Sequence, residues 1–217
     1  MNILAIFAHP DDEAFGPSGT IAKLAKDNNV ILLCATRGEA GEHHDPNEQA
    51  RIAQIREKEL ENSAKILGVK QIHFLGFKDG ELCNNLYHKL AESIEHYCKK
   101  YQPEMLITTE LRGISGHLDH IAVALATTYV FYRLTFIKKL YYYCLSQDKR
   151  ALIEDYFIYF PPGYKKADID LSNEITDVWD QKIAAIQAHK SQKKDGQTII
   201  DRLKKLPKLE HFQILKK

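Results

Sequence analysis

Short apolar runs alternate with longer amphipathic segments along most of the chain. The runs are too short for helices and are typical of strands that are buried on both faces. They predict strands over residues 2–8, 30–36, 71–77, 105–109 and 140–145. Between these runs, apolar residues recur at helical spacing, which predicts helices over residues 16–27, 47–67, 86–100 and 120–133.

Strands and helices in alternation predict an α/β fold, a Rossmann-like three-layer sandwich with a mainly parallel sheet. In such folds, ligands bind at the carboxyl ends of the strands, near the point where the strand order reverses. Later in the chain the pattern weakens. There we expect an aromatic strand over 156–160, a last strand over 167–171 and a last large helix over 176–189.

The length of 217 residues favours one domain, which we place at residues 1–192. The remaining segment, 193–217, has eight Lys or Arg residues against three Asp or Glu residues. We interpret it as a basic C-terminal tail or docking arm, and a basic interaction segment is the alternative.

Composition narrows the class of protein. The net charge of +1 gives no electrostatic footprint for nucleic acid or for an anionic membrane. The four cysteines form no CxxC pair, which favours a reducing compartment over a disulfide framework. The longest apolar candidate, residues 121–132, is too short for the ~20 residues that a membrane span needs. We therefore expect a cytoplasmic protein.

Acidic residues and a histidine crowd the end of the first predicted strand, in the stretch Ala8-His9-Pro10-Asp11-Asp12-Glu13. Adjacent carboxylates raise each other's pKa unless a cation neutralises them. His9 and Asp12 are three residues apart and can face one centre, where an imidazole nitrogen and a carboxylate oxygen suit Zn²⁺ or a similar divalent ion. The alternative is that the acids cap the following helix.

A second cluster, Gly116-His117-Leu118-Asp119-His120, lies just beyond the fourth predicted strand. His117 and His120 are spaced to lie on one side of a helical turn. Together the two clusters offer His, Asp and His for a three-ligand site with one open position. An open position is typical of catalytic zinc sites, since structural sites are closed by four ligands.

The AHPDDE and GHLDH stretches resemble the PIG-L/LmbE family of zinc-dependent deacetylases, which remove acyl groups from N-acylated amino sugars. The resemblance covers about residues 2 to 192, with weaker matches at residues 36–42, at Arg56-Glu57, at residues 74–77 with Asp79, and at residues 189–192. The chain departs from the family pattern at Leu118, where Pro is usual, and at Glu110-Leu111, where Asp-Pro is frequent.

The resemblance implies a role for each matching residue. It makes His9, Asp12 and His120 the zinc ligands, although another divalent metal is compatible. Asp11 becomes the general base for the metal-bound water. A protonated His117 becomes the acid that stabilises the oxyanion and protonates the leaving amine.

Four further residues have implied roles with open alternatives. Asp119 would orient a histidine, or else be a helix-start acid. Arg56 would contact substrate oxygens, or else pair with a nearby acid on the surface. Asp79 and Glu42 would contact sugar hydroxyls, or else cap loops.

We expect the partner to be a small-molecule substrate, an amino-sugar conjugate, and we expect no binding to nucleic acid or to a membrane. The sequence is also compatible with a homo-oligomer. Two other functions use the same residues: an amidase or esterase acting on a non-sugar substrate, and a non-catalytic metal-binding or sugar-binding module. A nicotinamide dehydrogenase is disfavoured, because HPDDEAFG rather than GxGxxG follows the first strand.

Overall fold

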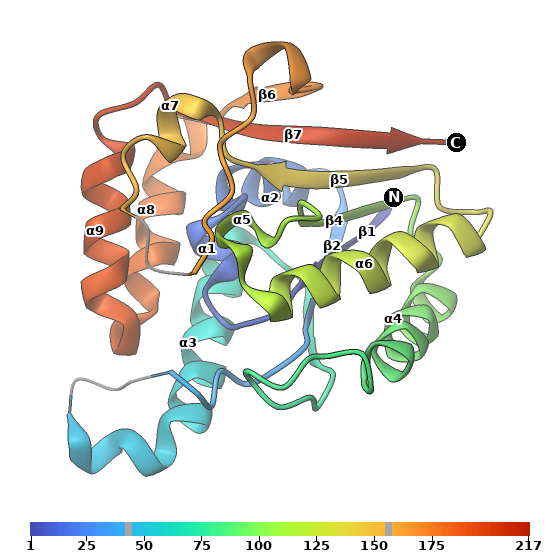
Figure 1. The fold of residues 1–217 in the computed structure, drawn as a ribbon, viewed down its shortest axis with the longest axis horizontal. Coiled ribbons are helices and arrows are strands. Elements are labelled where there is room, and N and C mark those ends of the chain that lie inside the picture. The colour runs from blue at the N-terminus through green and yellow to red at the C-terminus, as the bar shows by residue number, and fades with distance from the viewer. Residues whose placement is uncertain (42–44, 155–157) are drawn as a thin grey trace.

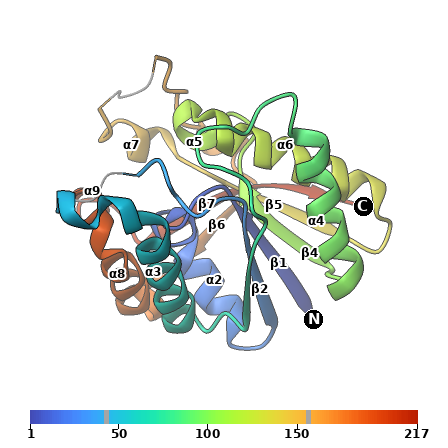
Figure 2. The same ribbon diagram turned by 90° about the horizontal axis from the view of Figure 1, so that it is seen from below.

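The computed structural model describes residues 1–41, 45–154 and 158–217 as one sheet with helices on both faces (Figures 1 and 2). Seven strands lie in the order β3-β2-β1-β4-β5-β7-β6. The first five are parallel, and β7 is antiparallel to both of its neighbours. The strands are β1 (Asn2–Phe7), β2 (Asn29–Cys34), β3 (Gln71–Phe74), β4 (Met105–Thr109), β5 (Lys139–Cys144), β6 (Leu171–Glu174) and β7 (Leu209–Lys216). The predicted α/β class with a mainly parallel sheet is confirmed.

Two layers of helices enclose the sheet. Figure 2 shows α2, α3 and α8 on one face and α4 and α6 on the other. The longer helices are α2 (Ser18–Ala25), α3 (Ile52–Leu67), α4 (Tyr87–Tyr101), α6 (Leu118–Arg133), α8 (Trp179–Ala188) and α9 (Lys193–Leu203). The short ones are α1 (Asp12–Phe15), α5 (Gly113–Gly116) and α7 (Gln147–Arg150).

The continuous apolar run of β1 explains why the sheet is covered on both sides. Alternate residues of a strand point to opposite faces. Ile3 and Phe7 pack into the core under α2, α3 and α8, whereas Leu4 and Ile6 pack into the core under α4 and α6. All four side chains are almost fully buried.

The strand order reverses at β1, whose neighbours are β2 and β4. From β1 the chain crosses to β2 on one side, while β4 lies on the other side. The loops that leave the carboxyl ends of β1 and β4 therefore diverge to opposite faces, which is the position where parallel sheets bind ligands. Both histidine-containing clusters follow these two strands.

The segment 193–217 is part of the fold and not a solvated tail. It forms α9 and β7, and β7 lies between β5 and β6 (Figure 1). Phe212 of β7 is fully buried in the core. The many basic residues of this segment led to the prediction of a tail. They are compatible with a strand, because only one face of β7 lies in the interior.

Other predicted elements also differ from the structure, among them the helix expected over 176–189, which begins as a 3₁₀ helix, Thr176–Val178, before α8. The long helix expected from residue 47 starts as a 3₁₀ helix, Pro46–Arg51, before α3. The last strand expected at 167–171 is wrong, since a 3₁₀ turn, Lys166–Asp168, precedes β6. Of the strand expected at 156–160, residues 156 and 157 lie outside the described residues, and residues 158–160 are irregular. No helix of the described segments is long and apolar enough to cross a membrane.

Candidate metal centre and active site

The loop after β1 folds so that Asp12 faces back toward the strand. The Asp12 carboxylate accepts hydrogen bonds from the backbone N–H groups of Ala8 and His9, at 3.1 and 2.9 Å. Asp11 precedes α1 with a φ of 112°, and its side chain makes no capping hydrogen bond to that helix. Neither Asp11 nor Asp12 therefore caps the following helix with its side chain, which was the alternative explanation for these acids.

The loop after β4 delivers the second cluster at the start of α6. His117 is the residue that caps this helix, and its Nδ1 accepts the backbone N–H of Asp119 at 3.2 Å. His120 lies in the first turn, and its Nδ1–H donates to the carbonyl oxygen of Gly113 at 3.1 Å. This bond leaves Nε2 of His120 as the nitrogen that faces the first cluster.

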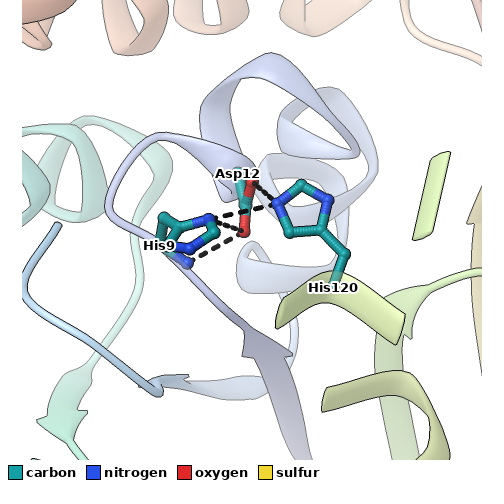
Figure 3. A group of neighbouring side chains, drawn as sticks. All are labelled: His9, Asp12 and His120. Carbon is teal, nitrogen blue, oxygen red and sulfur yellow. Dashed lines mark hydrogen bonds and ion pairs between the residues drawn. The ribbon is translucent and has the colours of Figure 1, made fainter. Parts of the chain in front are cut away.

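His9, Asp12 and His120 converge on one point (Figure 3). His120 Nε2 lies 3.1 Å from His9 Nδ1 and 3.1 Å from Asp12 Oδ1, and His9 Nδ1 lies 3.8 Å from Asp12 Oδ2. Two ligands of a tetrahedral zinc ion with bonds of 2.0–2.1 Å are about 3.3 Å apart. The three side chains therefore fit a divalent metal ion in both donor type and spacing.

The opposite nitrogen of His9 meets two further carboxylates. His9 Nε2 lies 2.9 Å from Asp79 Oδ1 and 3.1 Å from Asp119 Oδ2. Burial lowers the pKa of His9, but the hydrogen bonds to Asp119 and Asp79 outweigh burial and raise its pKa to about 10. Three acids around one imidazole favour positive charge there, and a metal ion held by His9 would supply it while Nε2–H stays bonded to the carboxylates.

Asp119 is anchored by backbone as well as by His9. Its carboxylate accepts the N–H groups of Gly80 and Leu82, at 2.8 and 3.1 Å. A second possible ligand group, His9 with His117 and Asp119, shares this carboxylate. Backbone N–H groups engage both oxygens of Asp119, whereas the two that bind Asp12 both go to Oδ2 and leave Oδ1 facing His120. The group with Asp12 and His120 therefore suits a metal better. Asp119 thus lies where it would orient the His9 ring.

Asp11 lies beside the cluster and is paired with a buried arginine. Arg56 Nη2 donates to Asp11 Oδ2 at 2.9 Å and to the carbonyl oxygen of Pro10 at 2.6 Å. Burial raises the pKa of Asp11 to about 6, although the Arg56 guanidinium acts to lower it. A carboxylate with a pKa near the working pH is suited to accept a proton and to release it.

Arg56 is almost fully buried, with 4% of its surface exposed. Its Nη1 donates to the carbonyl oxygen of Gly38 at 3.0 Å, which closes the loop after β2 over it, and lies 3.9 Å from Asp79 Oδ2. A side chain at Gly38, which has a φ of +73°, would collide with the guanidinium. Glycine is thus required there by both conformation and space. Arg56 therefore lies where it can hold the Asp11 carboxylate in place, and the expected contact with substrate stays a prediction.

Glu13 fixes the backbone of Asp11 from below. Its carboxylate accepts the N–H of Asp11 at 3.0 Å, the hydroxyl of Ser63 at 2.5 Å and the Nε2–H of His189 at 2.8 Å. Burial lowers the pKa of His189, but Glu13 outweighs burial and raises it. In the sequence, His189 stands out only as part of a weak family match, and nothing there identifies Glu13 as its partner. The one signal for Glu13 is that it belongs to the same acidic stretch.

His117 stacks on His120, with ring centroids 4.9 Å apart. Burial and the neighbouring His120 and His9 lower the pKa of His117 to about 4. Among these protein groups the ring is therefore neutral at neutral pH, whereas the sequence argument assumed a protonated ring. Since Nδ1 accepts a hydrogen bond, Nε2 is the atom that would hold a transferable proton.

Two expected substrate contacts remain. Asp79 is buried against His9 and accepts the N–H of Ala40 at 3.2 Å. One of its carboxylate oxygens therefore pairs with His9, and the expected contact with a sugar hydroxyl stays a prediction. Glu42 lies outside the described residues.

Comparison with known proteins places this site in a family. The family model described as GlcNAc-PI de-N-acetylase matches residues 4–131, which contain both clusters. A Bacillus cereus protein, "Probable N-acetyl-alpha-D-glucosaminyl L-malate deacetylase 2", is 30% identical over 196 residues, with 88% of this chain and 83% of that protein covered.

Two further relatives cover part or all of the chain. The 1D-myo-inositol 2-acetamido-2-deoxy-alpha-D-glucopyranoside deacetylase of Kineococcus radiotolerans is 32% identical, with 58% of this chain and 43% of that protein covered. The structure of N,N'-diacetylchitobiose deacetylase from Pyrococcus horikoshii superimposes with a TM-score of 0.74 and 25% identity, covering 99% of this chain and 84% of that one. With its two histidine clusters and this fold, the chain belongs to the PIG-L family of GlcNAc-PI de-N-acetylases.

Proposed function

We propose that the protein is a metal-dependent hydrolase, with zinc as the expected ion, that removes an acetyl or acyl group from an N-acylated amino sugar or glucosaminyl conjugate. The observation that carries the proposal is the convergence of His9, Asp12 and His120 at ligand spacing beside the buried carboxylate of Asp11. The relatives support the sugar class, since each is described as a deacetylase of such a compound.

His9, Asp12 and His120 would hold the ion. The chemistry that a divalent ion supplies when bound is a lowered pKa for a bound water and polarisation of the amide carbonyl. Asp11 takes the proton that the attacking water loses, and Arg56 keeps its carboxylate in place. Asp119 and Asp79 fix the His9 ring through Nε2–H.

His117 delivers a proton to the leaving nitrogen, which is a poor leaving group until it is protonated. Its lowered pKa means that the ring is neutral at the start. The proton that it passes to the nitrogen is made good by the one that Asp11 takes from the water, so both residues return to their starting forms. A low pKa also makes the protonated ring a strong acid toward an amine. The balanced outcome is a carboxylic acid and a free amino sugar from one amide and one water.

The test is release of free amine from N-acetylglucosamine conjugates and simple N-acyl amides, with a chelator or with added Zn²⁺. We expect metal-dependent release from the sugars. Asp11→Asn should lower kcat/KM by about 10²–10⁴-fold while the protein still binds metal. The exposed Asp27→Asn, which lies away from the cluster, is the matched control.

Other outcomes distinguish the alternatives. Release from simple amides or esters but not from sugars would favour the non-sugar hydrolase. Metal binding without any turnover would favour a binding module. Full turnover in Asp11→Asn would remove Asp11 as the base.

A further inference from the structure

The loop between β4 and α6 has a strained backbone. Gly113 has a φ of +72°, and Ile114 follows with a φ of 65° and a ψ of −63°. This second conformation is that of a tight γ-turn, which is rare and strained, and Ile114 is a β-branched residue. Such conformations cost about 1–3 kcal/mol and persist only where the surrounding structure enforces them.

The side chain that enforces this loop is Glu110, at the end of β4. Its carboxylate is 2% exposed, and it accepts the backbone N–H of Arg112 at 2.8 Å and that of Ile114 at 3.3 Å. The hydroxyl of Tyr164 donates to the same carboxylate at 3.0 Å. Arg112 Nε, at 3.2 Å, balances its charge.

The strained residues reach the candidate metal centre through a backbone carbonyl. The carbonyl oxygen of Gly113 accepts Nδ1–H of His120. That bond fixes the proton on Nδ1 and directs the Nε2 lone pair toward Asp12 and His9. The partner of a ligand histidine sets both its tautomer and its ring orientation.

We propose that Glu110 is a positioning residue for the metal ligand His120. It clamps the 112–114 backbone so that the Gly113 carbonyl faces the imidazole. This inference rests on the proposed metal site. It also assigns a role to the position where the chain departs from the family pattern, because Glu110-Leu111 stands where Asp-Pro is frequent.

The first test is Glu110→Gln in the full chain, which keeps the side-chain volume but replaces one acceptor oxygen by an NH₂ donor. We expect Zn²⁺ affinity, measured by competition with a chromophoric chelator, to fall by about tenfold or more. In the metal-depleted protein, ¹⁵N NMR of labelled histidine should show His120 shifting from the Nδ1–H form to a mixture of tautomers. A His120→Gln variant assigns its signal.

Glu59→Gln is the matched control. Glu59 is also buried, at 6% exposure, and its carboxylate accepts the N–H and the hydroxyl of Ser191 rather than the 112–114 loop. We expect it to leave Zn²⁺ affinity and the His120 tautomer unchanged. Unchanged affinity and tautomer in Glu110→Gln, or equal changes in Glu59→Gln, would overturn the proposal. If the wild-type chain bound no metal, the metal centre itself would fail, while the tautomer measurement would still decide the role of Glu110.

Discussion

Asp11 has its backbone fixed by Glu13 and its carboxylate fixed by Arg56. The first contact stabilises the positive φ, and the second places a guanidinium at 2.9 Å from Oδ2. Burial and this guanidinium act on the pKa of Asp11 in opposite directions, and burial prevails. A change at Arg56 should therefore shift the pH at which Asp11 ionises, and with it the pH dependence of activity.

Arg56→Met removes the positive charge beside Asp11. The pKa of the carboxyl group then rises further above about 6, and the base is ionised only at higher pH. We expect the acidic limb of the kcat/KM profile to move to higher pH, and Arg56→Lys to move it less. Arg51→Met, which removes an exposed charge just before α3, should leave the limb in place. If the acidic limb stayed in place in Arg56→Met, Arg56 would have no influence on the protonation of the base.

The spacing of the two motifs predicted which histidines and acids come together. The groups that hydrogen-bond to these side chains could not be predicted from the sequence. His9 and Asp12 are three residues apart, so one turn can bring them together. Asp79, Glu110 and the Gly113 carbonyl come from loops whose backbone path depends on tertiary contacts. Their hydrogen bonds therefore appear only in the folded chain.

At the scale of elements, a buried ion pair joins the helices behind the site to the last strand. Lys182 of α8 lies 2.8 Å from Glu210 of β7, and both side chains are fully buried. Glu210 also accepts the N–H groups of Gly19 and Thr20 in α2. Lys182 donates to the carbonyl oxygen of Gly16. One pair thus ties three elements together.

Lys182→Met leaves the Glu210 carboxylate buried without its cation. We expect the free energy of unfolding to fall by about 3–5 kcal/mol, as measured by urea denaturation at neutral pH. The control is Lys204→Met, because Lys204 pairs with Asp201 on the surface and such pairs contribute about 0–1 kcal/mol. Equal losses in the two variants would show that burial of the pair adds nothing.

The centre of the parallel sheet was predictable because β1, β2 and β4 are apolar runs that are buried along almost their whole length. β4 has the predicted bounds, Met105–Thr109, and the other four differ by one to three residues at one end or at both. β7 was missed because its inward face alternates an acid with an aromatic residue, Glu210 and Phe212. A buried acid interrupts the alternation of apolar and polar residues by which a strand is predicted. Here the partner of that acid, Lys182, lies on a distant helix, so the sequence gives no sign that Glu210 is buried.

At the scale of the whole molecule, the domain boundary expected at residue 192 would cut the sheet. β7 supplies the only contact between β6 and the rest of the described sheet. It also contributes Phe212 to the core under α2, α3 and α8. The compact unit therefore includes α9 and β7.

A chain shortened after Leu206 should lose cooperative unfolding. Removal of β7 exposes the edge of β5, opens the core at Phe212 and leaves Lys182 unpaired. Thermal unfolding followed by circular dichroism, together with limited proteolysis, measures the effect. A shortened chain that unfolds in one transition at the original midpoint would show that the compact unit does not need β7.

The position of β7 between β5 and β6 also orders events during synthesis. β6 leaves the ribosome before α8, α9 and β7, yet its only neighbour in the described sheet is β7. It must remain unpaired until a later part of the chain has emerged and docked on β5. The sheet is therefore completed out of sequence order, and the slow pairing of distant segments that this requires leaves β6 open to wrong partners in the interval.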